Sequence, residues 1–258
     1  MSRVEAMRIG GITDMSTVDW YGNVSLVVFF AGCNIRCPYC QNSSLIPIDS
    51  GQIVSMEVLE ERLRIGLEPV PQLDAVVLTG GEPLLQPDAV LTAAGIAKKQ
   101  GLKVMLDTNG TLYDSARKVI SSGLVDRVAL DVKAPLEADS YGKVTGRPEV
   151  GASLVSSVDS VLDLCRDLNI EMEARTTVVP GLSDDVDFIR SIADDIRGRV
   201  DVYYLQQFDN EGDVLSPELK NKNRPTRDQM LTLAQAANET GLSPVYIKTR
   251  FEGLELVT

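Results

Sequence analysis

The fold is decided by residues 26–40, which read Leu26-Val-Val-Phe-Phe-Ala-Gly-Cys33-Asn-Ile-Arg-Cys37-Pro-Tyr-Cys40. The first five residues are all apolar, which predicts a short strand covered on both faces. Three cysteines then follow within eight residues on the loop that leaves this strand. In α/β proteins, functional sites form at the carboxyl ends of parallel strands, so this loop is the first candidate site.

Working outward, five more apolar runs of strand length follow, and amphipathic helical patterns separate them. The predicted strands are 26–30, 75–79, 103–107, 127–132, 171–178 and 202–206. The predicted helices are 56–66, 87–100, 115–122, 153–168, 184–197 and 227–240. Six β/α units in succession predict a parallel sheet, because parallel strands need crossover helices. An open doubly wound sheet and a partial barrel both fit this pattern, and the 258 residues are expected to form one domain, 1–258.

The composition excludes several classes of function. The net charge is 25 − 37 = −12, and an acidic surface disfavours broad nucleic-acid binding and docking on anionic membranes. Residues 1–10 carry charges and no apolar segment, so we expect no signal peptide and a cytoplasmic protein. The chain has no histidine, which excludes a Cys/His zinc site and a Ser-His-Asp triad.

The spacing of Cys33, Cys37 and Cys40 favours an iron–sulfur cluster. Three thiolates on one loop can hold a [4Fe–4S] cluster and leave one iron without a protein ligand. A zinc knuckle is the alternative, but structural zinc usually takes four nitrogen or sulfur ligands. Cys165 is the only other cysteine, and it lies on the apolar face of a predicted helix, where we expect it to belong to the core. Plain buried cysteines are the remaining alternative for the triplet.

Polar and glycine-rich residues follow the next three predicted strands. They are the segment from Gly80 to Pro83, the segment from Asp107 to Gly110, and the pair Asp131 and Lys133. Because the carboxyl ends of parallel strands meet at one rim, we expect these residues to share a site with the cysteine loop.

The CxxxCxxC spacing resembles the radical S-adenosylmethionine superfamily. The resemblance implies a partial (β/α)6 TIM-like barrel, a [4Fe–4S] cluster, and S-adenosylmethionine bound at the open iron. It also implies that Tyr39 lies near the adenine and that Gly80, Gly81 and Glu82 match a GGEP motif that contacts the cofactor's amino group.

Further segments resemble the glycyl-radical activating enzymes, the group that contains pyruvate formate-lyase activating enzyme. In that group the aspartates matching Asp107 and Asp131 bind a monovalent cation, and Thr108 and Lys133 belong to the same DTNG and D-x-K motifs. Arg175 matches a position near the cofactor's carboxylate. Gln41 stands where these activators often have histidine, so an aromatic contact with the adenine would be lost.

Long stretches of the chain are similar to activating proteins of anaerobic ribonucleoside-triphosphate reductase, notably residues 10–46, 175–185 and 204–208. The resemblance implies abstraction of a glycine hydrogen from a partner glycyl-radical enzyme, with a one-electron donor such as flavodoxin or ferredoxin. The alternatives are a radical enzyme that modifies a small molecule or RNA, and a metal-binding interaction module without catalytic activity.

Overall fold

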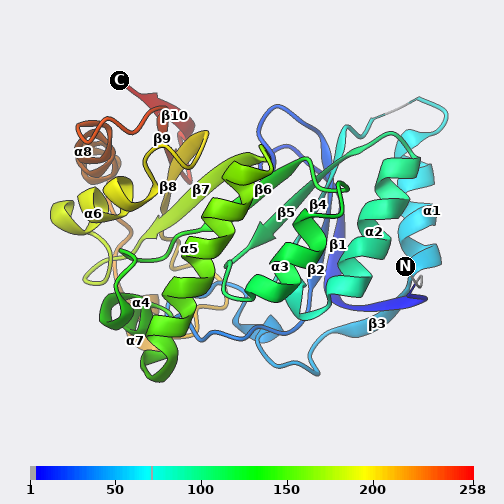
Figure 1. The fold of residues 1–258 in the computed structure, drawn as a ribbon, viewed down its shortest axis with the longest axis horizontal. Coiled ribbons are helices and arrows are strands. Elements are labelled where there is room, and N and C mark those ends of the chain that lie inside the picture. The colour runs from blue at the N-terminus through cyan, green and yellow to red at the C-terminus, as the bar shows by residue number, and fades with distance from the viewer. Residues whose placement is uncertain (1–3, 71) are drawn as a thin grey trace. The chain divides into compact units, whose positions relative to one another are not determined.

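The structure is a computed structural model that describes residues 4–70 and 72–258. The chain divides into two compact units. The first comprises the residues up to Asn34, Ser44–Thr108 and Asp114–Val128, and the second comprises Ile35–Ser43, Asn109–Tyr113 and Ala129–Thr258. Both units contain strands and helices (Figure 1).

The first unit is built on strands in the order β3-β1-β2-β4-β5. Their bounds are β1 Ala6–Ser16, β2 Ser25–Phe30, β3 Gln52–Ser55, β4 Ala75–Gly80 and β5 Lys103–Thr108. The helical segments are η1 Ser43–Leu45, α1 Met56–Leu67, η2 Pro83–Leu85, α2 Pro87–Lys99 and α3 Tyr113–Ile120. Strands β2, β4 and β5 are parallel, whereas β1 pairs antiparallel with both β2 and β3. The parallel register places the ends of β2, β4 and β5 at one edge of this unit's sheet.

The second unit continues from β6 with strands in the order β6-β7-β8-β9-β10. Their bounds are β6 Arg127–Asp131, β7 Glu171–Val178, β8 Val202–Gln207, β9 Val245–Thr249 and β10 Gly253–Val257. The helical segments are α4 Ala138–Val144, η3 Pro148–Val150, α5 Gly151–Asp167, α6 Val186–Ile196, α7 Pro217–Lys220 and α8 Arg227–Asn238. Strands β7, β8 and β9 are parallel, and β10 returns antiparallel to β9. Helix α8 begins at Arg227 because Thr226 and Gln229 form a reciprocal capping box.

All six predicted strands and all six predicted helices are present, with ends that agree within a few residues. The prediction missed four strands, β1, β3, β9 and β10, and the short helices α4 and α7. The missed strands β3 and β10 are largely exposed or half-buried, so they lack the continuous apolar runs that marked the others.

Trp20 fixes the loop between β1 and β2 within the first unit. Its side chain is buried, and its indole ring lies 5.9 Å from Lys103 Nζ and 5.8 Å from the guanidinium carbon of Arg127. Two cations near one aromatic ring stabilise its placement through cation–π attraction.

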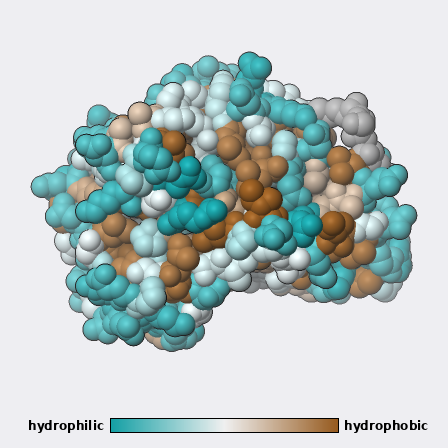
Figure 2. Space-filling view, turned by 90° about the horizontal axis from the view of Figure 1, so that it is seen from below, coloured by the Kyte–Doolittle hydropathy of each residue, from teal (hydrophilic) through white to brown (hydrophobic). Residues whose placement is uncertain are grey.

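The surface is mixed in character. Figure 2 shows hydrophobic residues in patches that hydrophilic residues separate on the face it presents. The exposed large apolar side chains include Val18 and Tyr21 in the first unit and Phe251, 79% exposed, in the second. Within the described part of the chain, none of the helices combines the length and the hydrophobicity needed to cross a bilayer.

Candidate functional site

The predicted site residues divide between the two units. Cys33, Gly80, Gly81, Glu82, Asp107 and Thr108 belong to the first unit. Cys37, Tyr39, Cys40, Gln41, Asp131, Lys133 and Arg175 belong to the second. The cysteine loop crosses from one unit to the other between Asn34 and Ile35. Neither unit alone, in its described residues, contains three or more Cys, His, Asp or Glu side chains grouped so that they could hold a metal ion.

In the first unit, the start of the cysteine loop is held by backbone hydrogen bonds. The N–H of Gly32 donates to the carbonyl of Leu45 over 2.8 Å, and the N–H of Cys33 donates to the carbonyl of Ile46 over 3.0 Å. Gly32 has φ of +91°, a conformation that favours glycine. Cys33 is buried, 8% exposed, so its thiol lies in a fixed and largely dry position.

The turn after β4 packs directly against this loop. Gly81 N–H donates to Phe30 O over 2.8 Å, and Glu82 N–H donates to Gly32 O over 2.7 Å. A Cβ atom on Gly81 would lie 2.2 Å from the carbonyl oxygen of Gly32, and one on Gly80 would lie 2.3 Å from Phe30 N. The two glycines are therefore required by the close approach of the protein's own backbone.

Glu82 connects the ends of β4 and β5. Its carboxylate is fully buried and accepts hydrogen bonds from Leu84 N over 2.9 Å and from Thr108 Oγ1 over 2.8 Å. Nearby strand-end residues are also paired, since Thr79 Oγ1 donates to Asp107 Oδ2 over 2.9 Å. The structure thus brings Glu82 into contact with Thr108, and it identifies Thr79 as an unforeseen partner of Asp107.

In the second unit, Cys37 and Tyr39 are buried and Cys40 is half-buried. The N–H of Cys40 donates to the carbonyl of Cys37 over 3.0 Å, which closes a tight turn around Pro38 and Tyr39. The loop is anchored further by Arg36 N–H, which donates to the carbonyl of Thr145 over 2.8 Å.

Lys133 is the charged group that faces this part of the loop. Its ammonium pairs with Asp131 Oδ2 over 2.8 Å and lies 5.8 Å from the centroid of the Tyr39 ring. Burial raises the pKa of Cys37 to about 11, and the positive charge of Lys133 opposes this rise. Burial lowers the pKa of Lys133, but Asp131, Tyr39 and Cys37 raise it more, so Lys133 stays charged.

Two buried residues of the second unit were not predicted from the sequence. Tyr141 is fully buried, and its hydroxyl lies 3.5 Å from the backbone N of Lys133 and 3.4 Å from the carbonyl of Asp131. No motif marked it. Glu173 forms a buried ion pair with Arg175, and their spacing of two residues on strand β7 was the available signal, because such residues share one face. The Arg175 charge is thus matched by a carboxylate of its own strand.

The chemistry of the predicted donor set favours an iron–sulfur cluster over zinc. The donor set consists of three thiols on one loop, two of them buried, in a chain without histidine. Burial raises the pKa of Cys37, and the positive charge of Lys133 partly offsets this rise toward the thiolate form that a cluster needs. Cys165 is fully buried in helix α5, and burial raises its pKa to about 12.

Comparison with known proteins finds relatives that are named as activating enzymes. The chain is 34% identical over 237 residues to a Methanocaldococcus jannaschii protein provisionally named a glycyl-radical enzyme activating enzyme, covering 90% of this chain and 92% of the relative. It is 31% identical to the pyruvate formate-lyase-activating enzyme of Clostridium pasteurianum, covering 74% of this chain and 76% of the relative.

Solved structures confirm the predicted fold class, α/β with mostly parallel strands of the partial (β/α)6 barrel type. A radical SAM methyltransferase from Sphaerobacter thermophilus superimposes with a TM-score of 0.69 at 14% identity, covering 89% of this chain and 67% of that one. In addition, residues 27–192 of the chain match the family described as the Radical SAM superfamily. The chain therefore belongs to the Radical SAM superfamily of enzymes.

Proposed function

We propose that this enzyme generates a glycyl radical on a partner enzyme. The observation that carries the proposal is its identity of 30–34%, over most of its length, to relatives named as activating enzymes. Membership of the superfamily implies a [4Fe–4S] cluster and S-adenosylmethionine. When bound, the reduced cluster supplies the electron that cleaves S-adenosylmethionine and yields the radical that abstracts hydrogen.

We assign the cluster to Cys33, Cys37 and Cys40. Lys133 holds positive charge beside Cys37, and its ion pair with Asp131 fixes its position. Cys33 and Cys37 are buried, so their surroundings would limit the access of water to a cluster held there.

The remaining predicted residues would bind S-adenosylmethionine. They are Tyr39, Gln41, Gly80, Gly81, Glu82, Asp107, Thr108, Asp131, Lys133 and Arg175. Their contacts within each unit support rigid placement, in particular the buried hydrogen bond between Glu82 and Thr108. A monovalent cation held by Asp107 and Asp131 stays a prediction.

Anaerobic ribonucleotide reductase is the partner we propose, with flavodoxin or ferredoxin as the electron donor and the cytoplasm as the compartment. The test is to mix the reduced, reconstituted enzyme, S-adenosylmethionine and the reductase under anaerobic conditions. A glycyl doublet in the electron paramagnetic resonance spectrum is expected. Cofactor cleavage without this doublet would contradict the partner and favour the small-molecule or RNA alternative.

The cluster assignment is tested separately with Cys37→Ala, and Cys165→Ala is the matched control. After anaerobic reconstitution, Cys37→Ala is expected to lose the cluster and all cleavage of S-adenosylmethionine. Cys165→Ala is expected to retain the iron and sulfide content of the wild type, because this thiol is buried in helix α5. Equal iron content in the Cys37→Ala variant and the wild type would refute the assignment.

A further inference from the structure

The loop that follows β8, residues 209–216 (the post-β8 loop), contacts the second half of the cysteine loop. Gln41 Nε2 donates to the carbonyl of Asp209 over 2.8 Å. Leu215 N–H donates to the carbonyl of Cys40 over 3.1 Å, and Ser216 N–H donates to the carbonyl of Pro38 over 2.8 Å. A parallel bridge also joins Asn42 to Asp213. The backbone on both sides of Cys40 is therefore held by residues about 170 positions later in the chain.

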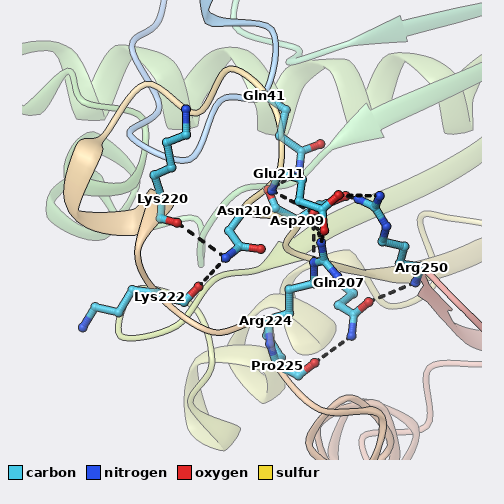
Figure 3. Close-up of polar contacts among 10 residues, drawn as sticks. All are labelled: Gln41, Gln207, Asp209, Asn210, Glu211, Lys220, Lys222, Arg224, Pro225 and Arg250. Carbon is cyan, nitrogen blue, oxygen red and sulfur yellow. Dashed lines mark hydrogen bonds and ion pairs between the residues drawn. The ribbon is translucent and has the colours of Figure 1, made fainter.

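The post-β8 loop has little regular structure of its own, and four charged side chains hold it (Figure 3). Arg224 donates to Asp209 Oδ1 over 2.9 Å through Nε and to Glu211 Oε1 over 2.6 Å through Nη2. Arg250 pairs with Asp209 Oδ2 and donates to Glu211 Oε2 over 2.6 Å. Each guanidinium thus bridges the same two carboxylates, and the charges balance.

This ion cluster has more contacts than an isolated surface pair. Gln207 accepts a hydrogen bond from Arg250 N over 2.9 Å and donates to the carbonyl of Pro225 over 2.7 Å, so both arginine-bearing segments are attached to the end of β8 (Figure 3). The ring of Phe251 lies 5.7 Å from the Arg224 guanidinium and 6.0 Å from that of Arg250. The Arg224 side chain is only 17% exposed. Two-pronged arginine contacts with low exposure restrict geometry more than isolated exposed pairs do.

We propose that Arg224 and Arg250 are positioning residues for Cys40. The two arginines fix Asp209 and Glu211 in the post-β8 loop. This loop in turn holds the Gln41 side chain and the Cys40 carbonyl, and these contacts set the orientation of the Cys40 thiolate. The proposal rests on the proposed function, because it requires Cys40 to be a cluster ligand. The proposal also gives Gln41 a structural role, through its hydrogen bond to Asp209. The sequence alone suggested only that Gln41 lies near the cofactor.

The expected consequence is a change in the cluster without the loss of a ligand. When the ion cluster is broken, the backbone around Cys40 becomes more mobile and more exposed to water. The potential of an iron–sulfur cluster depends on hydrogen bonding and solvent exposure around its sulfurs, so it should shift.

The first measurement uses the apoprotein and needs no cluster. Hydrogen–deuterium exchange is followed for the Leu215 and Ser216 amides in Arg250→Ala, Arg224→Ala and Gln41→Glu. Exchange several-fold faster than in the wild type is expected in all three variants. The two arginine variants break the ion cluster, and the carboxylate introduced by Gln41→Glu could not donate to the carbonyl of Asp209. The matched control is Arg227→Ala, which removes a two-pronged contact with Glu255, at 3.0 and 2.6 Å, elsewhere in the same unit. Its exchange at these amides should equal that of the wild type.

The second measurement uses the reconstituted enzyme. Arg250→Ala should retain the iron content of the wild type, but its cluster should show a shifted midpoint potential and an altered spectrum with S-adenosylmethionine. Arg250→Lys, which keeps the charge and loses the two-pronged contact, should give an intermediate shift and serves if the alanine variant fails to fold. If Arg250→Lys and Arg224→Ala show the same amide exchange and the same midpoint potential as the control Arg227→Ala, the positioning role is overturned. A wild-type protein that binds no iron would instead overturn the proposed function, and with it the ligand role of Cys40.

Discussion

Replacing Gly81 with alanine tests whether the turn after β4 is fitted to the backbone of the cysteine loop. The new Cβ would lie 2.2 Å from Gly32 O, 2.9 Å from Gly32 C and 3.2 Å from Leu45 O. All three atoms belong to the backbone, so no side-chain rotation can relieve the contact, and the segments must separate by about 1 Å to reach ordinary van der Waals distance. Gly81 has no positive φ, so the effect isolates this contact from backbone strain.

The size of the effect follows from the hydrogen bonds that such a shift would break. Gly81 N–H donates to Phe30 O at the end of β2 over 2.8 Å, and Glu82 N–H donates to Gly32 O in the cysteine loop over 2.7 Å. Each backbone bond contributes about 0.5–1.5 kcal/mol net, and a buried donor left unpaired costs about 1–3 kcal/mol. We therefore expect Gly81→Ala to lower the free energy of unfolding by about 2–4 kcal/mol. At roughly 2–4 °C per kcal/mol for a chain of this size, Tm should fall by between about 4 and 16 °C.

The assay is urea and thermal unfolding followed by circular dichroism at 222 nm. Gly95→Ala is the matched control, because Gly95 lies inside helix α2 and a Cβ there has no neighbouring atom within 4 Å. That control should be stabilised by about 0.5–1 kcal/mol, since alanine favours the helix over glycine. If Gly81→Ala unfolds within about 1 kcal/mol of the wild type, the close approach of the two backbones is not the reason for this glycine.

Three further substitutions have defined outcomes. Thr108→Val removes the hydroxyl that donates to the buried Glu82 carboxylate and should cost about 1–3 kcal/mol in urea unfolding, whereas Thr108→Ser should cost less. Cys165→Ser places a hydroxyl in the apolar core and should lower the free energy of unfolding by about 1–3 kcal/mol without changing the iron content. The wild type should lose free energy of unfolding between pH 5 and pH 3, and Asp209→Asn should make this loss smaller by up to about 1 kcal/mol, measured by urea unfolding.

The sign of the Asp209 effect follows from its lowered pKa. Partial burial raises the pKa of this carboxyl, but hydrogen bonds from Glu211 N–H, Arg250 and Arg224 outweigh it. Its contribution to stability is therefore complete above the unfolded pKa of about 3.9 and is lost as the pH falls through the lower folded pKa. An equal loss in the wild type and in Asp209→Asn would contradict this reasoning. Equal stability of Thr108→Val and Thr108→Ser, or loss of iron in Cys165→Ser, would contradict the other two predictions.

The central strands were predictable because both of their faces are covered. Residues such as Val76 and Leu78 in β4 are fully buried, so the sequence there is a continuous apolar run. Strand β1 carries two glycines and several polar residues, and its pairing with β2 has register shifts, so neither alternation nor an apolar run marks it. Strand β10 is half-exposed along most of its length and depends on pairing with β9.

Sequence reasoning could single out candidate site residues only where they lie next to a strand end. The cysteine triplet and Glu82 are of this kind. The anchor of Cys40 was not, because Leu215 is 175 positions away and its contact with the Cys40 carbonyl uses only backbone atoms, which no residue type identifies. Tyr141 was missed for a similar reason, since its hydroxyl contacts the backbone of Asp131 and Lys133.

The placement of Trp20 gives the protein an internal optical probe. It is the only tryptophan in the chain, it is buried in the first unit, and two cations lie near its ring. Its fluorescence therefore reports on the first unit alone, whereas circular dichroism sums the helices of both units. Coincident unfolding curves from the two signals would indicate that the 258 residues unfold as one cooperative domain, and separate curves would indicate two. The single indole thus makes the cooperativity between the two units measurable without a label.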